Sequence, residues 1–300
     1  MVTDNRTNCV YFSALLKQGK LSHPDIFRNI ATELEKRGIE YHLLEDTRDI
    51  WCRDYMPVQI ERDAFIGFDY DPDYLQGSYE HLKTKQADVV KTLNISAPDC
   101  GYVIDGGNVV KCGKDILMTV KAVEEINRIR KEKNLGDPLE KDEVQRLLTQ
   151  CFGYNVILLP WEKKGGDVFG HTDGLVRYVC PGEVVITYLA DKPGEHTEKQ
   201  YLESVEKELV RHGYKVHKLD FSGFADNRKY MASWAYVNFL QTEKVILVPG
   251  LNNEELDAEA MVQIRRIFHE YRPEDIVQIQ LTSIIGKGGA LNCISWNIAR

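Results

Sequence analysis

Residues 24–44 read PDIFRNIATELEKRGIEYHLL, and this stretch contains the pattern that decides the fold. After Pro24, apolar residues recur at helical spacing, which is typical of an amphipathic helix with proline in its first turn. Gly38 ends the predicted helix, and residues 39–44 are typical of a strand. The stretch therefore predicts a helix, a glycine stop and a strand, in that order.

The same order recurs along the whole chain. Predicted helices lie at 24–37, at 87–93, in a stretch around Leu147 that ends at Gly153, at 198–212 and at 255–271, and the strands that follow them lie at 39–44, 102–104, 156–159, 214–219 and 276–281. The copies are about 60 residues apart, a period typical of stacked or radially arranged units. We therefore expect an α/β fold of repeated units in a single domain, residues 1–300. A doubly wound α/β sheet, in which helices and strands also alternate, is the alternative.

The composition narrows the class of protein. Hydrophobic residues make up 43% of the 300 residues and charged residues 28%, as in ordinary globular chains. The net charge of −8, with no basic block interleaved with aromatic residues, argues against a nucleic-acid partner. No apolar run approaches the roughly 18 residues that span a bilayer, and residues 1–8 do not resemble a signal peptide. We expect a cytoplasmic protein that does not bind membranes.

The seven cysteines support the same interpretation. Their number is odd, their spacing is irregular and no C-x-x-C occurs, which argues against a disulfide framework and against a zinc cluster. We expect most of them to be small core residues in a reducing compartment, with one available as a nucleophile.

Residues 130–144 form the most highly charged stretch. Such a stretch predicts a solvated surface insertion between helices rather than a functional site.

Four short segments depart from the apolar pattern next to predicted strands. The first, residues 51–57, reads WCRDYMP. It is compatible with a surface turn in which Arg53 pairs with Asp54. It is also compatible with an Asp54 carboxylate beside the aromatic wall of Trp51, which suits a planar cation.

The second segment, residues 105–108, reads DGGN between two predicted strands. Asp-Gly is a common hairpin turn, so a plain hairpin is one interpretation. The other is that the glycines allow the backbone beside Asp105 to approach a ligand closely.

The third segment, residues 170–174, reads GHTDG. If it is extended, His171 and Asp173 point to the same side. This arrangement suits a general base or, together with Asp167 upstream, part of a metal site.

The fourth segment, residues 286–295, reads GKGGALNCIS. Three glycines lead to Cys293, which is expected to start the last strand. Cys293 is either a buried structural cysteine or a nucleophile whose thiolate is favoured by backbone N–H groups. Lys287 does not match a phosphate-binding loop, since neither a helix nor Ser or Thr follows it.

One cysteine, one histidine and several aspartates together indicate a cysteine-based hydrolase. A metal-dependent hydrolase that uses His171, Asp173 and Asp167 is a weaker alternative. The histidine-rich strands of a dinuclear metal site are absent from the sequence.

The order of these motifs resembles one family. W-x-R-D-x-x-P, D-G-G-N, G-H-x-D and G-G-x-x-x-C follow one another as in the agmatine deiminase and bacterial peptidylarginine deiminase family. Shorter matches lie between them, at residues 115–127, 234–239, 245–249 and 257–260. The resemblance covers about residues 40–300.

The resemblance implies a pentein fold, a five-bladed α/β propeller of ββαβ repeats with the active site on its axis. It also implies that a guanidinium is hydrolysed to a ureido group with release of ammonia through a Cys293 thiouronium intermediate. The implied roles are Asp54 and Asp173 as the guanidinium clamp, His171 as acid and base, and Trp51, Asp105 and Asn238 as substrate-binding residues. Neither a metal nor an organic cofactor is implied.

The resemblance points to a small cationic guanidine as substrate, with agmatine, converted to N-carbamoylputrescine, the first choice. Peptidylarginine is the alternative substrate, and a catalytically silent pentein that acts as a binding protein is the alternative function. A homo-oligomer is compatible with the sequence.

Two departures from the family bear on the substrate and the site. Asn292 stands where many members have a histidine before the nucleophile. Residues 69–73, DYDPD, are acidic where the peptidylarginine deiminase has arginines for a peptide carboxylate. An acidic rim suits a substrate with a second positive charge.

Overall fold

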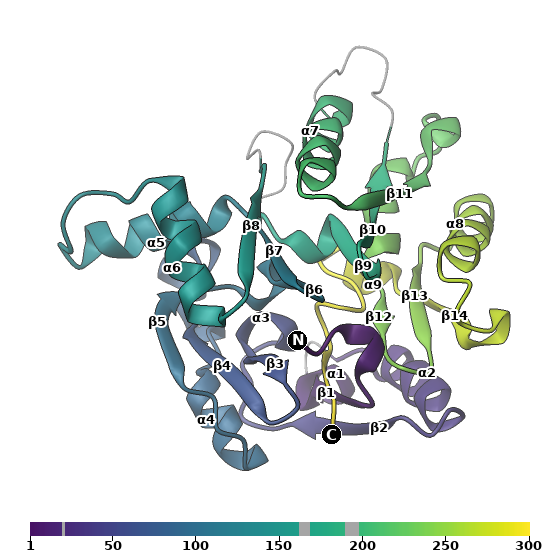
Figure 1. The fold of residues 1–300 in the computed structure, drawn as a ribbon. Coiled ribbons are helices and arrows are strands. Elements are labelled where there is room, and N and C mark those ends of the chain that lie inside the picture. The colour runs from purple at the N-terminus through teal and green to yellow at the C-terminus, as the bar shows by residue number, and fades with distance from the viewer. Residues whose placement is uncertain (20–21, 162–168, 190–197) are drawn as a thin grey trace.

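Three-stranded sheets are the repeated unit of the fold (Figure 1). The computed structural model describes residues 1–19, 22–161, 169–189 and 198–300, and these residues contain five such sheets. In each sheet the central strand pairs antiparallel with one neighbour and parallel with the other. In strand order the sheets are β15–β1–β2 (Trp296–Ile298, Cys9–Ser13, Glu40–Leu44), β3–β4–β5 (Val58–Glu61, Ala64–Asp69, Asp99–Val103), β6–β7–β8 (Val110–Cys112, Asp115–Thr119, Asn155–Leu159), β9–β10–β11 (Val176–Cys180, Glu183–Tyr188, Lys215–Asp220) and β12–β13–β14 (Leu240–Gln241, Ile246–Gly250, Ile276–Gln280).

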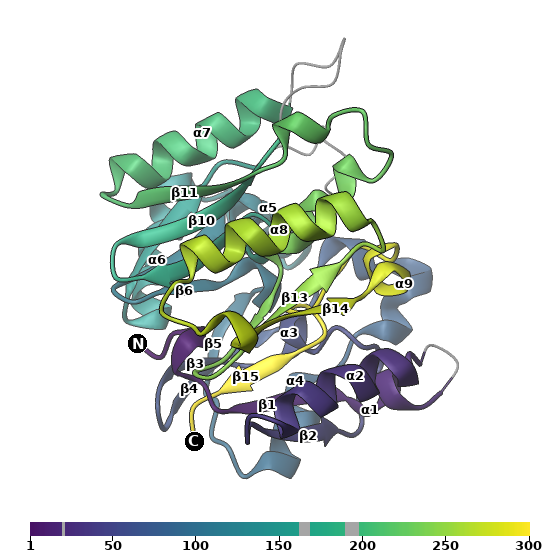
Figure 2. The same ribbon diagram turned by 90° about the vertical axis from the view of Figure 1, so that its right-hand side faces the viewer.

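In every unit a helical crossover joins the central strand to its parallel neighbour, as parallel pairing requires. The crossover helices are α2 (Pro24–Glu35, preceded by the short α1, Ala14–Lys17), α4 (Gln86–Val90), α5 and α6 (Lys121–Glu132, Lys141–Phe152), α7 (Glu198–Arg211) and α8 (Glu254–Ile267). Figure 2 shows α7, α8 and α2 one above another on one outer side of the molecule. Their ends follow the sequence signals, since Pro24 opens α2 and Gly153, at φ +70°, caps α6.

The predicted repeat of helix, stop and strand is confirmed in all five units. The doubly wound sheet is wrong, because no sheet among the described residues has more than three strands. The chain ends meet in the first unit, where the C-terminal β15 pairs with the N-terminal β1. A pairing between the two ends of the chain thus completes the sheet of the first unit.

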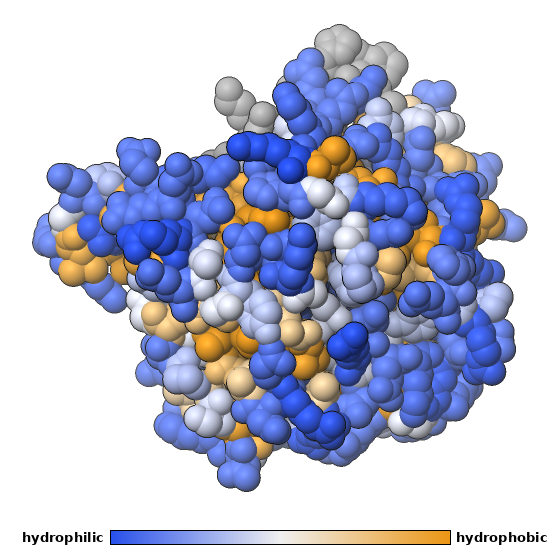
Figure 3. All heavy atoms as spheres, in the orientation of Figure 1, coloured by the Kyte–Doolittle hydropathy of each residue, from blue (hydrophilic) through white to orange (hydrophobic). Residues whose placement is uncertain are grey.

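The charged stretch 130–144 runs from the end of α5 to the start of α6, and residues 131–138 are all exposed. It lies between two helices, as predicted. Figure 3 shows that hydrophilic residues cover most of this face of the molecule, with smaller apolar groups between them. None of the helices in the described part of the chain combines the length and the apolar character that a membrane span requires.

Candidate active site

The predicted site residues occupy the same place in each unit, directly before its first strand. The five segments are α3 (Cys52–Tyr55), the 3-10 helices Gly106–Asn108, Thr172–Gly174 and Tyr230–Val237, each of these helices with the residue on either side of it, and the turn 290–295 before β15. The three 3-10 helices contact one another in succession, and the first of them contacts α3. The Asn238 carbonyl accepts a hydrogen bond from the Asn292 backbone N–H, and the Cys293 carbonyl accepts one from Arg53 N–H. The last segment thus returns to the first, and residues far apart in sequence meet at one site.

Asp54 in α3 is buried rather than part of a surface turn, with 6% of its surface exposed. The guanidinium of Arg53 turns away from it and donates to the Asn292 carbonyl and to Asn297 Oδ1. The predicted Arg53–Asp54 pair is therefore wrong, and the carboxylate is left for another partner.

The segment 105–108 is not a hairpin, because β5 and β6 on either side of it belong to different sheets. Its glycines bring the backbone against two site residues. A Cβ atom on Gly107 would lie 2.5 Å from His171 Nδ1 and 2.7 Å from Asp54 Oδ1. Only glycine fits there without displacing one of these side chains.

His171 lies between two carboxylates. Its Nε2 is 2.8 Å from Asp105 Oδ2, and its Nδ1 is 3.9 Å from Asp54 Oδ1. Burial opposes protonation, but the charges of Asp105 and Asp54 outweigh it and raise the pKa of His171 to about 10. The imidazole is therefore protonated at neutral pH.

One expectation about this region is corrected by the geometry. The residues after His171 form a 3-10 helix, so His171 and Asp173 do not share one face of an extended segment. Asp105 accepts a hydrogen bond from the Tyr74 hydroxyl and pairs with His171. It lines neither of the two cavities that contain Cys293, and its part in substrate binding stays a prediction.

Cys293 lies in the turn before β15, not in the strand itself. Its Sγ is 3.3 Å from Asn238 Oδ1 and 3.6 Å from Asp173 Oδ2. Burial raises the pKa of Cys293 well above its usual value, and the charges of Asp173 and Asp54 raise it further. Both effects favour the thiol over the thiolate in the ligand-free protein, and the role of Cys293 as nucleophile stays a prediction.

Asn292, the departure from the family pattern, holds the second carboxylate. Its Nδ2 donates to Asp173 Oδ2 at 2.6 Å, and both side chains are buried. Asn238 Oδ1 accepts hydrogen bonds from the backbone N–H groups of Asn292 and Cys293. The nucleophile and Asp173 are thus fixed by two asparagine side chains.

The ionised form of Asp54 is disfavoured in the free protein. Burial raises its pKa well above the usual value, as do the nearby carboxylates of Asp105, Asp173 and Asp49, while His171 lowers it. Its Oδ1 has no hydrogen-bond partner among the described residues. A buried carboxylate in this state favours a bound cation.

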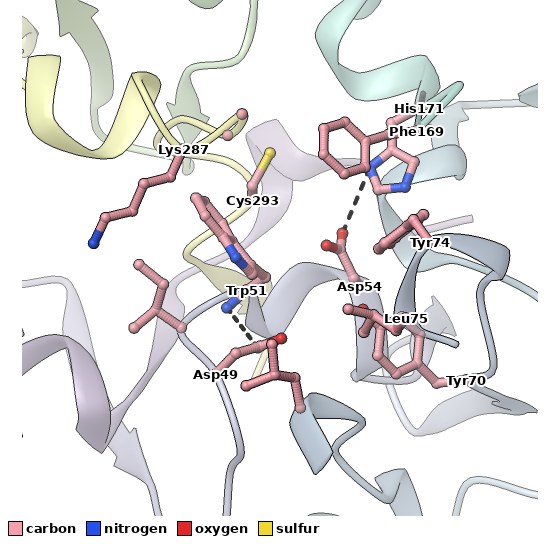
Figure 4. Close-up of a pocket in the computed structure, with 14 residues that line it drawn as sticks. Asp49, Trp51, Asp54, Tyr70, Tyr74, Leu75, Phe169, His171, Lys287 and Cys293 are labelled. Carbon is pink, nitrogen blue, oxygen red and sulfur yellow. Dashed lines mark hydrogen bonds and ion pairs between the residues drawn. The ribbon is translucent and has the colours of Figure 1, made fainter. Parts of the chain in front are cut away.

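Two cavities meet at Cys293. The first, of about 190 Å³, is called the Trp51 cavity and is also lined by Asp49 and Asp54 (Figure 4). The second, of about 390 Å³, is called the Trp234 cavity and is also lined by Asp173 and Asn238. Both include Phe169, His171 and Gly288. The predicted site residues other than Asp105 thus line one or both cavities.

Trp51 forms a wall of its cavity, as predicted. A Cβ atom on Gly289 would lie 2.2 Å from the Trp51 ring, so this glycine lets the chain that leads to Cys293 pass against the indole. The sequence analysis did not identify Asp49, Tyr74 or Phe169 as cavity residues. Asp49 lies two residues before Trp51 and Phe169 lies two residues before His171, which is the one signal that could have found them, whereas Tyr74 reaches the site only through the fold.

Asp54, Asp105 and His171 place one ligand atom each within 4.8 Å of one another, so this group could hold a metal ion. Asp173 is not part of the group, and Asp167 lies outside the described residues. The absence of a metal or organic cofactor remains a prediction.

The comparisons with known proteins agree with these motifs. The family model of the Porphyromonas-type peptidyl-arginine deiminase matches residues 21–298. The chain belongs to this family. The agmatine deiminase of Ectopseudomonas mendocina is 26% identical over 219 residues, and the alignment covers 65% of this chain and 56% of that protein. The agmatine deiminase of Pseudomonas fluorescens is 23% identical, with 82% of this chain and 73% of that protein covered.

The fold is that of a solved deiminase. The agmatine deiminase of C. jejuni superposes with a TM-score of 0.69 over 100% of this chain and 95% of that chain. At 14% identity this likeness concerns the fold.

Proposed function

We propose that this member of the deiminase family hydrolyses a guanidinium group to a ureido group and ammonia, with agmatine as substrate and N-carbamoylputrescine as product. The observation that carries the proposal is the buried Cys293 thiol among ionisable groups from two other segments, α3 and residues 170–174. Its Sγ lies 3.6 Å from Asp173, and Asp54 and the protonated His171 face the same space. These groups match the needs of a planar cationic electrophile.

Asp54 and Asp173 are the proposed clamp. Carboxylates bind a guanidinium through paired charge-assisted hydrogen bonds, which orient the plane of the substrate as well as neutralise its charge. The two residues reach Cys293 from different cavities, so a guanidinium between them would present its central carbon to the sulfur. Trp51 would pack against the attached alkyl chain.

Substrate binding would also activate the nucleophile. The charges of Asp173 and Asp54 help to keep Cys293 a thiol, and a bound guanidinium neutralises them. The pKa of Cys293 then falls, the thiol proton passes to solvent water, because His171 is already protonated, and the thiolate attacks the central carbon. A nucleophile that forms only with substrate present is protected from other electrophiles.

His171 would serve both halves of the reaction. As an imidazolium it gives its proton to the departing nitrogen, so that ammonia leaves and the thiouronium forms. The neutral imidazole then takes a proton from water, which attacks the same carbon, and the Cys293 thiolate leaves as the ureido product forms. Asp105 holds the imidazole for both steps.

We further propose that the five units are the blades of a pentein propeller and that residues 1–300 form one catalytic domain. The shared strand order of the five sheets and the succession of contacts among the site segments support this arrangement. A site on such an axis collects residues from every blade.

A cationic active-site reagent tests the nucleophile. 2-Chloroacetamidine resembles a guanidinium, whereas iodoacetamide is neutral, so the clamp should make Cys293 the cysteine that reacts selectively with the amidine. Mass spectrometry of the digested protein identifies the modified residue, with Cys293→Ala as control. Labelling of other cysteines while Cys293 stays unmodified would refute its assignment and favour the binding-protein alternative.

A metal-assisted hydrolysis is the second candidate, because Asp54, Asp105 and His171 form a plausible ligand group. Turnover that survives exhaustive chelation would exclude it. Turnover that disappears and returns with added divalent metal would support it over the thiouronium route.

A further inference from the structure

The acidic stretch 69–73 does not provide the unpaired negative charge that its sequence suggests. Asp71 pairs with Lys83 and Arg128, and Asp73 pairs with Lys121 at 2.5 Å. None of its aspartates lines the Trp51 cavity. If the substrate carries a second positive charge, a residue outside this stretch must bind it.

Asp49 has the properties of a residue that binds such a charge. It lines the Trp51 cavity although only 5% of its surface is exposed. Its Oδ1 accepts a hydrogen bond from the backbone N–H of Trp51 at 2.9 Å. No described residue donates a hydrogen bond to Oδ2 or forms an ion pair with the carboxylate.

The electrostatic state of Asp49 confirms that it lacks a cationic partner. Burial raises its pKa to about 7, and the charge of Asp105 adds to this effect. A bound cation would relieve the cost of holding this carboxylate ionised inside the protein. Lys287 does not supply it, since this lysine is exposed and its Nζ lies 3.0 Å from His23 Nε2.

The shape of the cavity relates Asp49 to the reacting centre. In Figure 4, Cys293 and Asp49 lie at opposite ends of the Trp51 indole, and Asp54 faces the space between them. Tyr70 and Leu75 complete an apolar lining. When the guanidinium of a substrate lies at Asp54, its alkyl chain can lie along the Trp51 indole and lead towards Asp49.

We propose that Asp49 binds an ammonium group at the far end of the substrate, so that the Trp51 cavity selects guanidines with a primary amine on a short alkyl chain. This inference rests on the proposed deiminase function and deepens it, because it assigns substrate selection to a residue outside the reacting groups.

Asp49→Asn tests the inference without disturbing the local fold. The amide has the same shape, and its oxygen can still accept the hydrogen bond from Trp51 N–H. Two substrates are compared, agmatine and n-butylguanidine, which has the same alkyl chain without the amine. Asp69→Asn is the matched control, because Asp69 is an exposed aspartate of the neighbouring acidic stretch.

The wild-type protein should prefer agmatine by roughly 10- to 100-fold in kcat/KM, the range of one hydrogen bond to a charged group. Asp49→Asn should remove most of this preference by raising KM for agmatine, and its effect on kcat/KM for n-butylguanidine should be several-fold smaller. Asp69→Asn should leave both substrates as in the wild type.

Equal losses of kcat/KM on both substrates would show that Asp49 has a structural role and would overturn the inference. A wild-type protein that turns over both substrates equally well would also overturn it. If neither substrate is turned over, the proposed function fails on its own. Calorimetry with the Cys293→Ala protein then decides about Asp49, because agmatine binding should weaken about tenfold or more when Asp49→Asn is added. Unchanged binding would refute the inference.

Discussion

The Trp51 and Trp234 cavities share Cys293 but differ in how their carboxylates are held. In the Trp234 cavity, Asp173 accepts a 2.6 Å hydrogen bond from Asn292. In the Trp51 cavity, Asp49 and Asp54 each have a carboxylate oxygen that receives no hydrogen bond from the described residues. One side of the nucleophile is therefore organised before the substrate arrives, and the other needs a cation to complete it.

Burial keeps Cys293 a thiol in the free protein, and the charges of Asp173 and Asp54, one from each cavity, add to this effect. A permanently neutralised site would keep a reactive thiolate exposed to any electrophile, whereas uncompensated carboxylates keep the thiol protonated until a guanidinium binds. The distinction between the two cavities can be tested at five positions.

The largest effect is expected at the residue that the cavities share. Cys293→Ala removes the proposed nucleophile, so kcat should fall by at least about 10⁴-fold. The change replaces a thiol by hydrogen, and the melting temperature should remain close to that of the wild type. Ammonia release measures the first quantity and thermal unfolding the second. Substantial remaining turnover would show that another group attacks the substrate.

Removing the charge of each clamp residue should have different effects on the stability of the protein. Asp54→Asn should lower kcat/KM by about 10³-fold without loss of stability, because it removes a buried charge that the free protein does not neutralise. Asp173→Asn should lower both activity and stability, the latter by about 1–2 kcal/mol, because it weakens the bond from Asn292. Steady-state kinetics and urea unfolding distinguish the two results. Identical stability changes would mean that the cavities do not differ as described.

Asp49→Asn should stabilise the protein in a pH-dependent way. The folded-state pKa of about 7 exceeds the usual 3.8, so the ionised group destabilises the fold above that usual value. The cost grows between the two values and reaches about 4 kcal/mol above pH 7. The gain in unfolding free energy should therefore be larger at pH 8 than at pH 5. A loss of stability at pH 8 would contradict an unpartnered Asp49.

The smallest expected change is a shift of the alkaline limb in the pH profile of kcat/KM. His171 must carry its proton into the first step, and kcat/KM should decline on the alkaline side only as the pH approaches the His171 pKa of about 10. Asp105→Asn removes the charge that raises this pKa most, so the alkaline limb should move to lower pH. An unmoved limb, measured over pH 6–10, would assign the limb to another group.

The repeated units could be predicted from the sequence because each depends on local signals. Pro24 opens a helix and Gly153 ends one, and both act within a few residues. The pairing of β15 with β1 joins opposite ends of the chain, and no local pattern contains it.

The residues of the site were predictable for a related reason. Each motif directly precedes the first strand of a unit, where polar residues and glycines interrupt an apolar pattern. Their environment was not predictable, because burial and charge come from distant segments. No local motif shows that two carboxylates flank His171, and Asp49 was overlooked for the same reason.

Ammonia release from a panel of guanidines tests the central claim most directly. The panel contains agmatine, free arginine and peptides with internal or C-terminal arginine, and the Cys293→Ala protein serves as the blank. The account predicts Cys293-dependent turnover with agmatine as the fastest substrate. Faster turnover of a peptide would move the assignment to peptidylarginine. If no guanidine of the panel releases ammonia and 2-chloroacetamidine does not modify Cys293, the account is contradicted.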